Sequence, residues 1–228
     1  MTDILSRIDA RGITRLCHFT PSRNLLHIGS GNVGVLSTAS LNATERSIFN
    51  PTDLERLDQH TTHICCSVEY PNAWYFDKAR SKEKLFPDWV VLLIKPQYLT
   101  ETTTLFSPRN AAANFGRNIQ GGVTGFDAMY ADRLQGAYGK WFHRSASHLP
   151  ACPTDQQAEV LIYDRINIAD ISGVAVQSVE QANTEKVRLE LNGVDPNVFR
   201  FVVAPHLFDK HELSAMIQSG NRLTETPV

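Results

Sequence analysis

The prediction of the fold starts from residues 153–163, whose sequence is Pro-Thr-Asp-Gln-Gln-Ala-Glu-Val-Leu-Ile-Tyr. Two glutamines and the carboxylate of Glu159 stand directly before an aliphatic and aromatic run with the composition of a strand. A buried strand therefore begins at a carboxylate, and we expect Glu159 to lie where the edge of a sheet opens into a cleft. The alternative is that Glu159 is an ordinary charged residue at the end of a strand, facing water.

The composition is that of a folded globular protein. Of 228 residues, 42% are hydrophobic and 20% are charged, which excludes the disordered class. One core can bury most of the apolar surface of a chain of this length, so we predict a single domain over residues 1–228. The net charge of -2 gives no global positive field of the kind that attracts nucleic acid. Any contact with nucleic acid must therefore be local.

The sequence favours a cytoplasmic location without membrane contact. No apolar signal region follows Met1, and no apolar run approaches the ~20 residues that cross a bilayer. The cysteines are not spaced as pairs of metal ligands, which predicts buried thiols in a reducing compartment and no metal site. They are Cys17, Cys65, Cys66 and Cys152.

Apolar runs bounded by turn-forming residues predict the other strands. The uninterrupted apolar run at 89–94 is expected in the middle of a sheet. A flexible joint is expected at the glycine-rich residues 121–125, and a helix-like piece at 107–113. Further strands are expected at 13–19, 33–36, 63–70, 105–106, 160–163, 171–176 and 199–203, and helices at 4–11, 23–28, 73–80, 126–134, 179–191 and 207–217, followed by a fraying tail.

Two polar residues close to the N-terminus stand at alternate positions of a predicted strand. Alternate residues of a strand point to the same face, so His18 and Thr20 can reach one ligand. Taken alone, a histidine at a strand end is more often a hydrogen-bonded structural residue.

Together, His18-Phe19-Thr20 and Gln157-Ala158-Glu159 resemble the H-x-T and Q-A-E elements of the DarT family. This family consists of NAD-dependent ADP-ribosyltransferases, bacterial toxins that modify nucleic acid bases. The resemblance extends from His18 to the strands after Glu159. It implies a mixed α/β (α+β) ADP-ribosyltransferase fold with a split central β-sheet around an NAD-binding cleft. It also implies NAD as co-substrate and no metal.

The resemblance implies roles for the matching residues. Glu159 would stabilise the positive charge that develops on the ribose, and it would accept a proton from the attacking nitrogen or oxygen. His18 and Thr20 would hold the ribose or the nicotinamide amide. Asn24 matches a family asparagine that follows the H-x-T element, and it is expected to bind NAD with them.

Residues 37–62 are polar and have no sustained period, which indicates a functional loop with a short helix at 52–60. The resembled family has a key arginine here, and the planar guanidinium can bind two phosphate oxygens of a pyrophosphate. Arg56 is the better match and is expected to act with Glu159, while Arg46 is the second candidate for binding NAD. The alternative for each arginine is a solvated loop with surface ion pairs.

Two groups of aromatic residues are candidates for ligand contacts. The resemblance suggests that Tyr75 and Phe76 line the nicotinamide pocket, although consecutive aromatic residues are most often core. Residues 135–153 are basic and aromatic, and we expect Lys140, Trp141 and Arg144 to contact a single strand, because bases stack on rings while phosphates meet cations. The alternative is an ordinary surface loop with a partly buried Trp141.

The sequence thus predicts a toxin that transfers ADP-ribose from NAD to a base in single-stranded DNA and releases nicotinamide. A toxin–antitoxin or anti-phage defence system is expected, with an antitoxin protein such as a macrodomain ADP-ribosyl hydrolase as partner. Two alternatives stay open. One is an ADP-ribosyltransferase that acts on RNA bases or on a protein. The other is a non-catalytic module that binds NAD or nucleic acid, against which the joint presence of Glu159, His18 and Thr20 argues.

Overall fold

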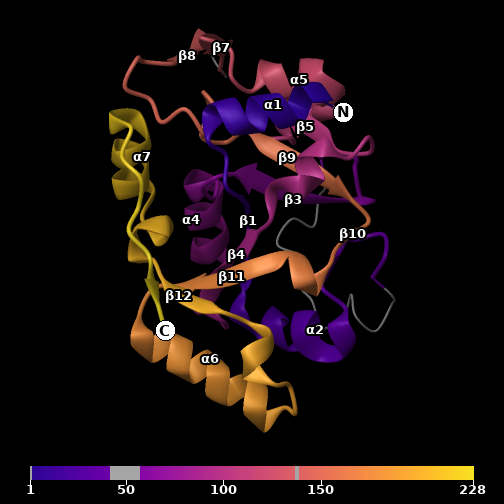
Figure 1. The fold of residues 1–228 in the computed structure, drawn as a ribbon, viewed down its shortest axis with the longest axis vertical. Coiled ribbons are helices and arrows are strands. Elements are labelled where there is room, and N and C mark those ends of the chain that lie inside the picture. The colour runs from indigo at the N-terminus through magenta and orange to yellow at the C-terminus, as the bar shows by residue number, and fades with distance from the viewer. Residues whose placement is uncertain (1, 42–56, 137–138) are drawn as a thin grey trace.

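A computed structural model of the chain describes residues 2–41, 57–136 and 139–228. Helices and strands are mixed along the chain, which confirms the predicted α/β class (Figure 1). The helices are α1 (Thr2–Arg11), α2 (Leu25–Gly29), α4 (Ala73–Lys82), α5 (Gly122–Ala128), α6 (Val179–Leu191) and α7 (Lys210–Ser219). The strands are β1 (Leu16–Pro21), β2 (Val35–Leu36), β3 (His63–Val68), β4 (Trp89–Ile94), β5 (Leu105–Ser107), β6 (Gln120–Gly121), β7 (Arg133–Gln135), β8 (Trp141–His143), β9 (Glu159–Tyr163), β10 (Arg165–Ile166), β11 (Ile171–Val176), β12 (Phe201–Val203) and β13 (Thr226–Pro227).

Nine of the described strands form one sheet in the order β13-β12-β11-β4-β1-β3-β9-β5-β6. Its neighbours run antiparallel except for β11 and β12, which are parallel. Helix α6 packs against β11 and β12 at one end, while α1 and α5 lie together beside β5 at the other (Figure 1). Two antiparallel pairs stand outside this sheet: β10 with β2, which are distant in sequence, and the consecutive strands β7 and β8.

The centre of the core is β4, as its sequence predicts. All six of its residues are buried, and it pairs with β1 on one side and β11 on the other. Because successive side chains point to opposite faces, burial of every residue means that both faces of the sheet are covered here. An uninterrupted apolar run is what such a position requires.

The sheet is split between β1 and β3. In the described chain, β3 pairs only with Leu16 and Cys17 of β1, whereas all six residues of β1 pair with β4. From His18 onward, β1 forms no ladder of backbone hydrogen bonds with β3 in the described chain. The two halves of the sheet are therefore joined at the start of β1 and separate after it, which confirms the split central sheet implied by the resemblance.

The glycines at 121–125 do not form a flexible joint, and this prediction is wrong. Helix α5 begins at Gly122 and ends at Ala128, earlier at both ends than the predicted helix at 126–134. A Cβ at Gly125 would stand 2.3 Å from the carbonyl oxygen of Gln120, so glycine is needed for close packing of the helix against β6.

Both ends of the chain also differ from prediction. Strand β1 begins at Leu16 rather than at residue 13, because the backbone N–H of Thr14 donates to the carboxylate of Glu69 at 2.8 Å instead of to a strand. The tail does not fray at its end, since β13 pairs with β12. Helix α7 begins at Lys210, where Asp209 accepts two backbone N–H groups as the N-cap.

Candidate active site

A tight turn positions Glu159 at the first residue of β9. The side-chain carboxylate of Asp155 accepts the backbone N–H of Gln157 at 2.9 Å. The main-chain carbonyl oxygen of Asp155 accepts the N–H of Ala158, also at 2.9 Å. The side chain of Arg109 lies 3.4 Å from the same carboxylate in a mostly buried ion pair. Burial raises the pKa of Asp155, while the Gln157 N–H and Arg109 oppose that rise. The turn before the strand is therefore fixed by one aspartate, and Glu159 follows in a defined direction.

The carboxylate of Glu159 is held from the neighbouring strand. Its Oε2 accepts the backbone N–H of Ala111 at 2.7 Å, and its Oε1 accepts Nδ2 of Asn110 at 3.4 Å. The residue is 8% exposed and pairs with Ser107 of β5 in the ladder. The buried hydroxyl of Ser107 has no hydrogen-bond partner in the described chain. Two donors thus fix an acidic group that keeps a small opening to solvent.

His18 bridges the split in the sheet with its ring. Its Nδ1 lies 2.9 Å from the carbonyl oxygen of Cys65 on β3. Burial lowers the pKa of His18, and the bond to this carbonyl opposes the effect in part. Because a carbonyl can only accept, Nδ1 carries the proton of the neutral ring, and Nε2 keeps a lone pair as an acceptor.

A second acceptor lies on the same half of the sheet. The Nδ2 of Asn24 donates to the hydroxyl oxygen of Thr20 at 2.7 Å, which leaves Oδ1 of Asn24 buried. This oxygen has no partner in the described part of the chain. A buried orphan acceptor is costly unless a ligand supplies a donor. The structure therefore brings His18, Thr20 and Asn24 to one side of the split, with two acceptor atoms that fit hydroxyl or amide donors.

The other residues predicted to bind NAD have different positions. Arg46 and Arg56 lie outside the described residues. Tyr75 is half-buried near the start of α4. Phe76 is only 1% exposed and stacks on Phe19, with ring centroids 4.6 Å apart, so it is a core residue. The prediction that Phe76 lines a ligand pocket is corrected accordingly.

The predicted nucleic-acid segment, residues 135–153, starts within the hairpin of β7 and β8, of which the structure describes both strands. Lys140 and Trp141 are exposed, and the guanidinium of Arg133 lies over the Trp141 ring at 5.1 Å. Arg144 has another role, since its guanidinium donates to the backbone carbonyls of Cys152, Leu149 and Pro150. These bonds fold the loop that leads to Asp155, so the Arg144 guanidinium is engaged with backbone carbonyls and the prediction that it contacts nucleic acid is corrected.

The family model for "ssDNA thymidine ADP-ribosyltransferase, DarT" matches residues 17–209. This span includes both sides of the split sheet. The chain belongs to the DarT family. No curated protein matches its sequence.

Solved structures of this family have the same fold. A DarT from Thermus sp. 2.9 in complex with NAD+ is 15% identical, with a TM-score of 0.55 over 86% of this chain and 98% of that chain. A Thermosipho africanus DarTG in complex with ADP-ribose is 14% identical, with a TM-score of 0.52 over 86% of this chain and 51% of that chain. The Thermus DarT in complex with ADP-ribosylated ssDNA is 12% identical, with a TM-score of 0.50 over 82% of this chain and 97% of that chain.

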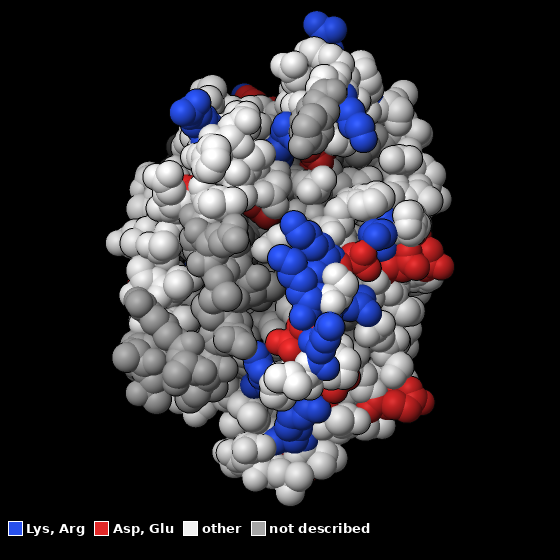
Figure 2. Space-filling view, turned by 180° about the vertical axis from the view of Figure 1, so that it is seen from behind, with Lys and Arg blue, Asp and Glu red and all other residues white. Residues whose placement is uncertain are grey.

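A basic surface that the sequence analysis missed lies outside the hairpin. Figure 2 shows Lys and Arg side chains gathered in a band on the face opposite to that of Figure 1. Exposed cations on α4 and the turn after it, Lys78, Lys82 and Lys84, have no ion-pair partner among the described residues. In a chain with a net charge of -2, this band gives one face a local positive field.

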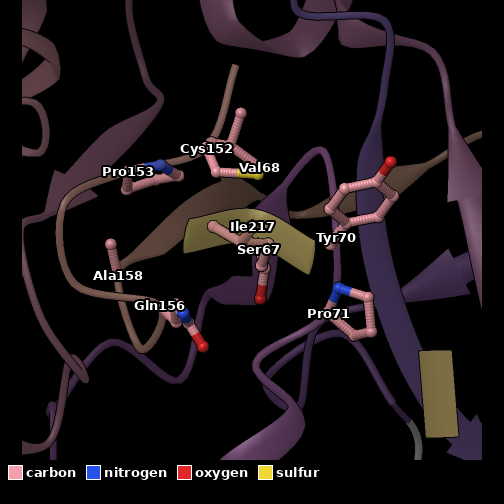
Figure 3. Close-up of a pocket in the computed structure, with 9 residues that line it drawn as sticks. All are labelled: Ser67, Val68, Tyr70, Pro71, Cys152, Pro153, Gln156, Ala158 and Ile217. Atoms are coloured by element: carbon pink, nitrogen blue, oxygen red, sulfur yellow. The ribbon is translucent and has the colours of Figure 1, made fainter. Parts of the chain in front are cut away.

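The pocket in Figure 3 is not a nucleotide site. It lies between the end of β3, the turn before Glu159 and α7, and Ser67, Cys152, Gln156 and Ile217 are among its lining residues. Its volume of about 240 Å³ includes open solvent and is still below the ~300–1,000 Å³ of ligand pockets. The Gln156 side chain accepts the hydroxyl of a serine on α7, so this region fastens that helix to the turn.

The described residues contain neither a cluster of metal ligands nor a membrane-spanning helix. No group of three or more His, Cys, Asp or Glu there could hold a metal ion. No described helix combines the length and apolar character needed to span a bilayer. All four cysteines are free thiols, and burial raises the pKa of Cys17 to about 12.

Proposed function

We propose that this chain transfers ADP-ribose from NAD to thymidine in single-stranded DNA and releases nicotinamide. The observation that carries the proposal is the carboxylate of Glu159, held by the Ala111 N–H beside the split of a DarT-family sheet. The name of the family and the Thermus complexes with NAD+ and with ADP-ribosylated ssDNA support the two substrates.

The reaction exchanges one bond to C1′ of the ribose for another. The bond from C1′ to the nicotinamide nitrogen breaks, and its electron pair leaves with nicotinamide. Positive charge then develops on the ribose, where a nearby carboxylate stabilises it. The attacking atom of the base forms the new bond to C1′ and gives its proton to Glu159. Since Glu159 already accepts two hydrogen bonds that orient it, its carboxylate needs little reorganisation for either role.

The acceptors on the other side of the split fit the donors of NAD. Nε2 of His18 and Oδ1 of Asn24 would accept from ribose hydroxyls or from the nicotinamide amide, with Thr20 holding Asn24 in place. Tyr75 remains a candidate for the nicotinamide ring. On the resemblance to the family, Arg56 is the first candidate and Arg46 the second for the arginine that holds the pyrophosphate, and Arg56 is also assigned to catalysis with Glu159.

The exposed ring and cation of the β7–β8 hairpin suit the acceptor strand. A base can stack on Trp141 while Lys140 meets a phosphate. Arg109 ties this hairpin to the active site, because it donates to the carbonyl oxygen of Gln135 and also contacts Asp155. The DNA-binding surface and the turn before Glu159 are therefore connected directly.

The biological setting proposed is a cytoplasmic toxin in a toxin–antitoxin or anti-phage system. Free buried thiols are typical of a reducing compartment. An antitoxin that removes ADP-ribose, such as a macrodomain hydrolase, would be the partner. We also propose that residues 1–228 form one domain, which is supported by a sheet with strands from β1 to β13.

The test uses labelled NAD with three acceptors, an oligodeoxynucleotide that contains thymidine, the same oligomer without it, and the corresponding RNA. Wild type, Glu159→Gln and Glu190→Gln are compared, the last being a matched change at an exposed residue of α6. Label on the thymidine oligomer alone, lost only in Glu159→Gln, is expected. Label on RNA would show that RNA is the acceptor. No label on any acceptor with wild type would refute the proposed transferase activity.

A further inference from the structure

The loop between β5 and β6, residues 108–119, holds an exposed aromatic ring in an unusual backbone. The sequence predicted a helix-like piece at 107–113, but the described loop is a series of turns with a short 3-10 segment, Ala113–Gly116. Asn114 and Phe115 have φ values of 55° and 56°, and Gly116 follows with 78°. Left-handed backbone is rare for residues with a side chain, above all for a bulky one such as Phe115.

The left-handed backbone does not bury the Phe115 ring against the rest of the described chain. The residue is 66% exposed, and its ring has no aromatic or cation partner in the described part of the chain. Strained residues persist where the surroundings impose them, and they concentrate at functional sites. A turn that carries an aromatic ring into solvent leaves the face of that ring available for stacking on a ligand.

The turn is fixed at its base. Successive backbone bonds, from the N–H of Ala113 to Asn110 and from the N–H of Phe115 to Ala112, close it at 2.9 and 3.2 Å. Gly116 lies so close to Asp58 that a Cβ there would stand 2.7 Å from the Asp58 carbonyl oxygen. The ring is therefore presented by an anchored loop.

The same loop holds the catalytic carboxylate. Ala111, which donates to Glu159, stands four positions before Phe115, so the two Cα atoms are at most ~14 Å apart. Arg117, two positions after Phe115, is exposed and has no ion-pair partner among the described residues. A ring and a cation without an ion-pair partner among the described residues thus lie on the loop whose backbone holds the Glu159 carboxylate.

We propose that Phe115 and Arg117 form a subsite for the acceptor strand, on which a base flanking the modified one stacks while its phosphate meets the guanidinium. The inference rests on the proposed function. Rings that stack on bases and nearby cations together give affinity for single strands without sequence preference. The left-handed turn places this pair on the loop that orients Glu159, so binding of the strand and alignment of the reacting base are coupled.

The test measures three quantities for each variant: KM for a thymidine oligodeoxynucleotide, affinity for NAD without DNA by calorimetry, and Tm. Phe115→Ala should raise KM for DNA about 5- to 150-fold, the range for loss of one stacked base, with NAD affinity unchanged. Phe115→Trp keeps an aromatic ring, so its KM for DNA should stay close to that of wild type. Leu191→Ala, the same kind of truncation at an 81% exposed residue of α6, should leave KM unchanged.

Phe115→Gly separates the ring from the backbone. Glycine adopts the left-handed turn without a Cβ penalty, so this variant should lose DNA affinity as Phe115→Ala does while its Tm does not fall. A KM for DNA within twofold of wild type in Phe115→Ala would overturn the inference, as would an equal loss of NAD affinity. The proposed function is judged separately, by whether wild type labels DNA and Glu159→Gln does not.

Discussion

The backbone N–H of Ala111 donates a 2.7 Å hydrogen bond to the carboxylate of Glu159, across 48 positions of sequence. This backbone donor remains with any residue other than proline at position 111. The side chain of Asn110 adds the second, longer contact to the same carboxylate. The orientation of Glu159 is therefore set mainly by the path of the β5–β6 loop, and side chains adjust it.

Replacement of Asn110 should reduce turnover more than binding. Loss of one modest hydrogen bond costs about 0.5–1.5 kcal/mol, so Asn110→Ala should lower kcat about 2- to 10-fold while KM for NAD stays within twofold. Steady-state kinetics with labelled NAD measure both. Asn192→Ala, at the exposed end of α6, is the matched control. A rise in KM for NAD with unchanged kcat would place Asn110 in NAD binding instead.

Trp141 and Lys140 should differ in their effects on DNA binding. Each phosphate contact to a single strand contributes a slope of about -0.7 to log K against log salt, so Lys140→Gln should make the slope less negative by about 0.7. Trp141→Ala should weaken binding at every salt concentration and leave the slope unchanged, since stacking releases no counterions. Fluorescence anisotropy of a labelled oligothymidine from low to moderate salt tests both. Equal slopes for wild type and Lys140→Gln would exclude a phosphate contact.

Stability should depend on pH through His148. Burial and the nearby Arg144 lower its pKa, and its Nε2 contacts the carbonyl oxygen of Pro153 at 3.0 Å. Because the native pKa lies below the unfolded value of about 6.5, the unfolded chain binds more protons between the two. The free energy of unfolding therefore decreases as pH falls below 6.5 toward the native pKa.

The measurement for His148 is Tm at several pH values between 5 and 8. His148→Gln keeps a donor for Pro153 and removes the titrating group, so it should lose less Tm than wild type on acidification. Comparison of the two chains cancels the contribution of other groups such as Asp155. The same pH dependence in both would show that His148 does not govern this transition.

Replacement of Glu69 should lower the free energy of unfolding more than replacement of its ion-pair partner Arg222. Its buried carboxylate accepts the N–H and the hydroxyl of Thr14 and pairs with Arg222 at 2.5 Å, which fastens both ends of the chain to β3. Glu69→Ala leaves the Thr14 groups without an acceptor and should cost about 2–4 kcal/mol of unfolding free energy. Arg222→Ala should cost about 1 kcal/mol or less, because its side chain is 47% exposed. Urea titrations of the two variants test the order, and a larger loss in Arg222→Ala would contradict it.

The sequence alone was informative where local composition decides burial. The apolar run at 89–94 indicated a central strand, and β4 is buried throughout. The strand after Glu159 was predicted from the change from polar to aliphatic residues, and β9 begins at that residue. The family resemblance, carried by the short elements around His18 and Glu159, gave the split sheet.

Glycine and arginine were harder to interpret, because each serves different purposes in different surroundings. Gly125 was expected in a joint, but it allows close packing of a helix on Gln120. Arg144 was expected on phosphate, but it folds a loop through three carbonyls. Neither outcome can be inferred from neighbours in sequence, since the partners depend on how the chain returns on itself.

The sequence by itself therefore determined the class of fold, the central strand and the acid that begins β9, because apolar periodicity and the residue types of a motif are local properties. Only the tertiary structure decided where β1 parts from β3, which backbone donor holds Glu159, and that Phe115 projects from a left-handed turn. These features arise from contacts between distant segments, and their free energies exist only once the segments have met.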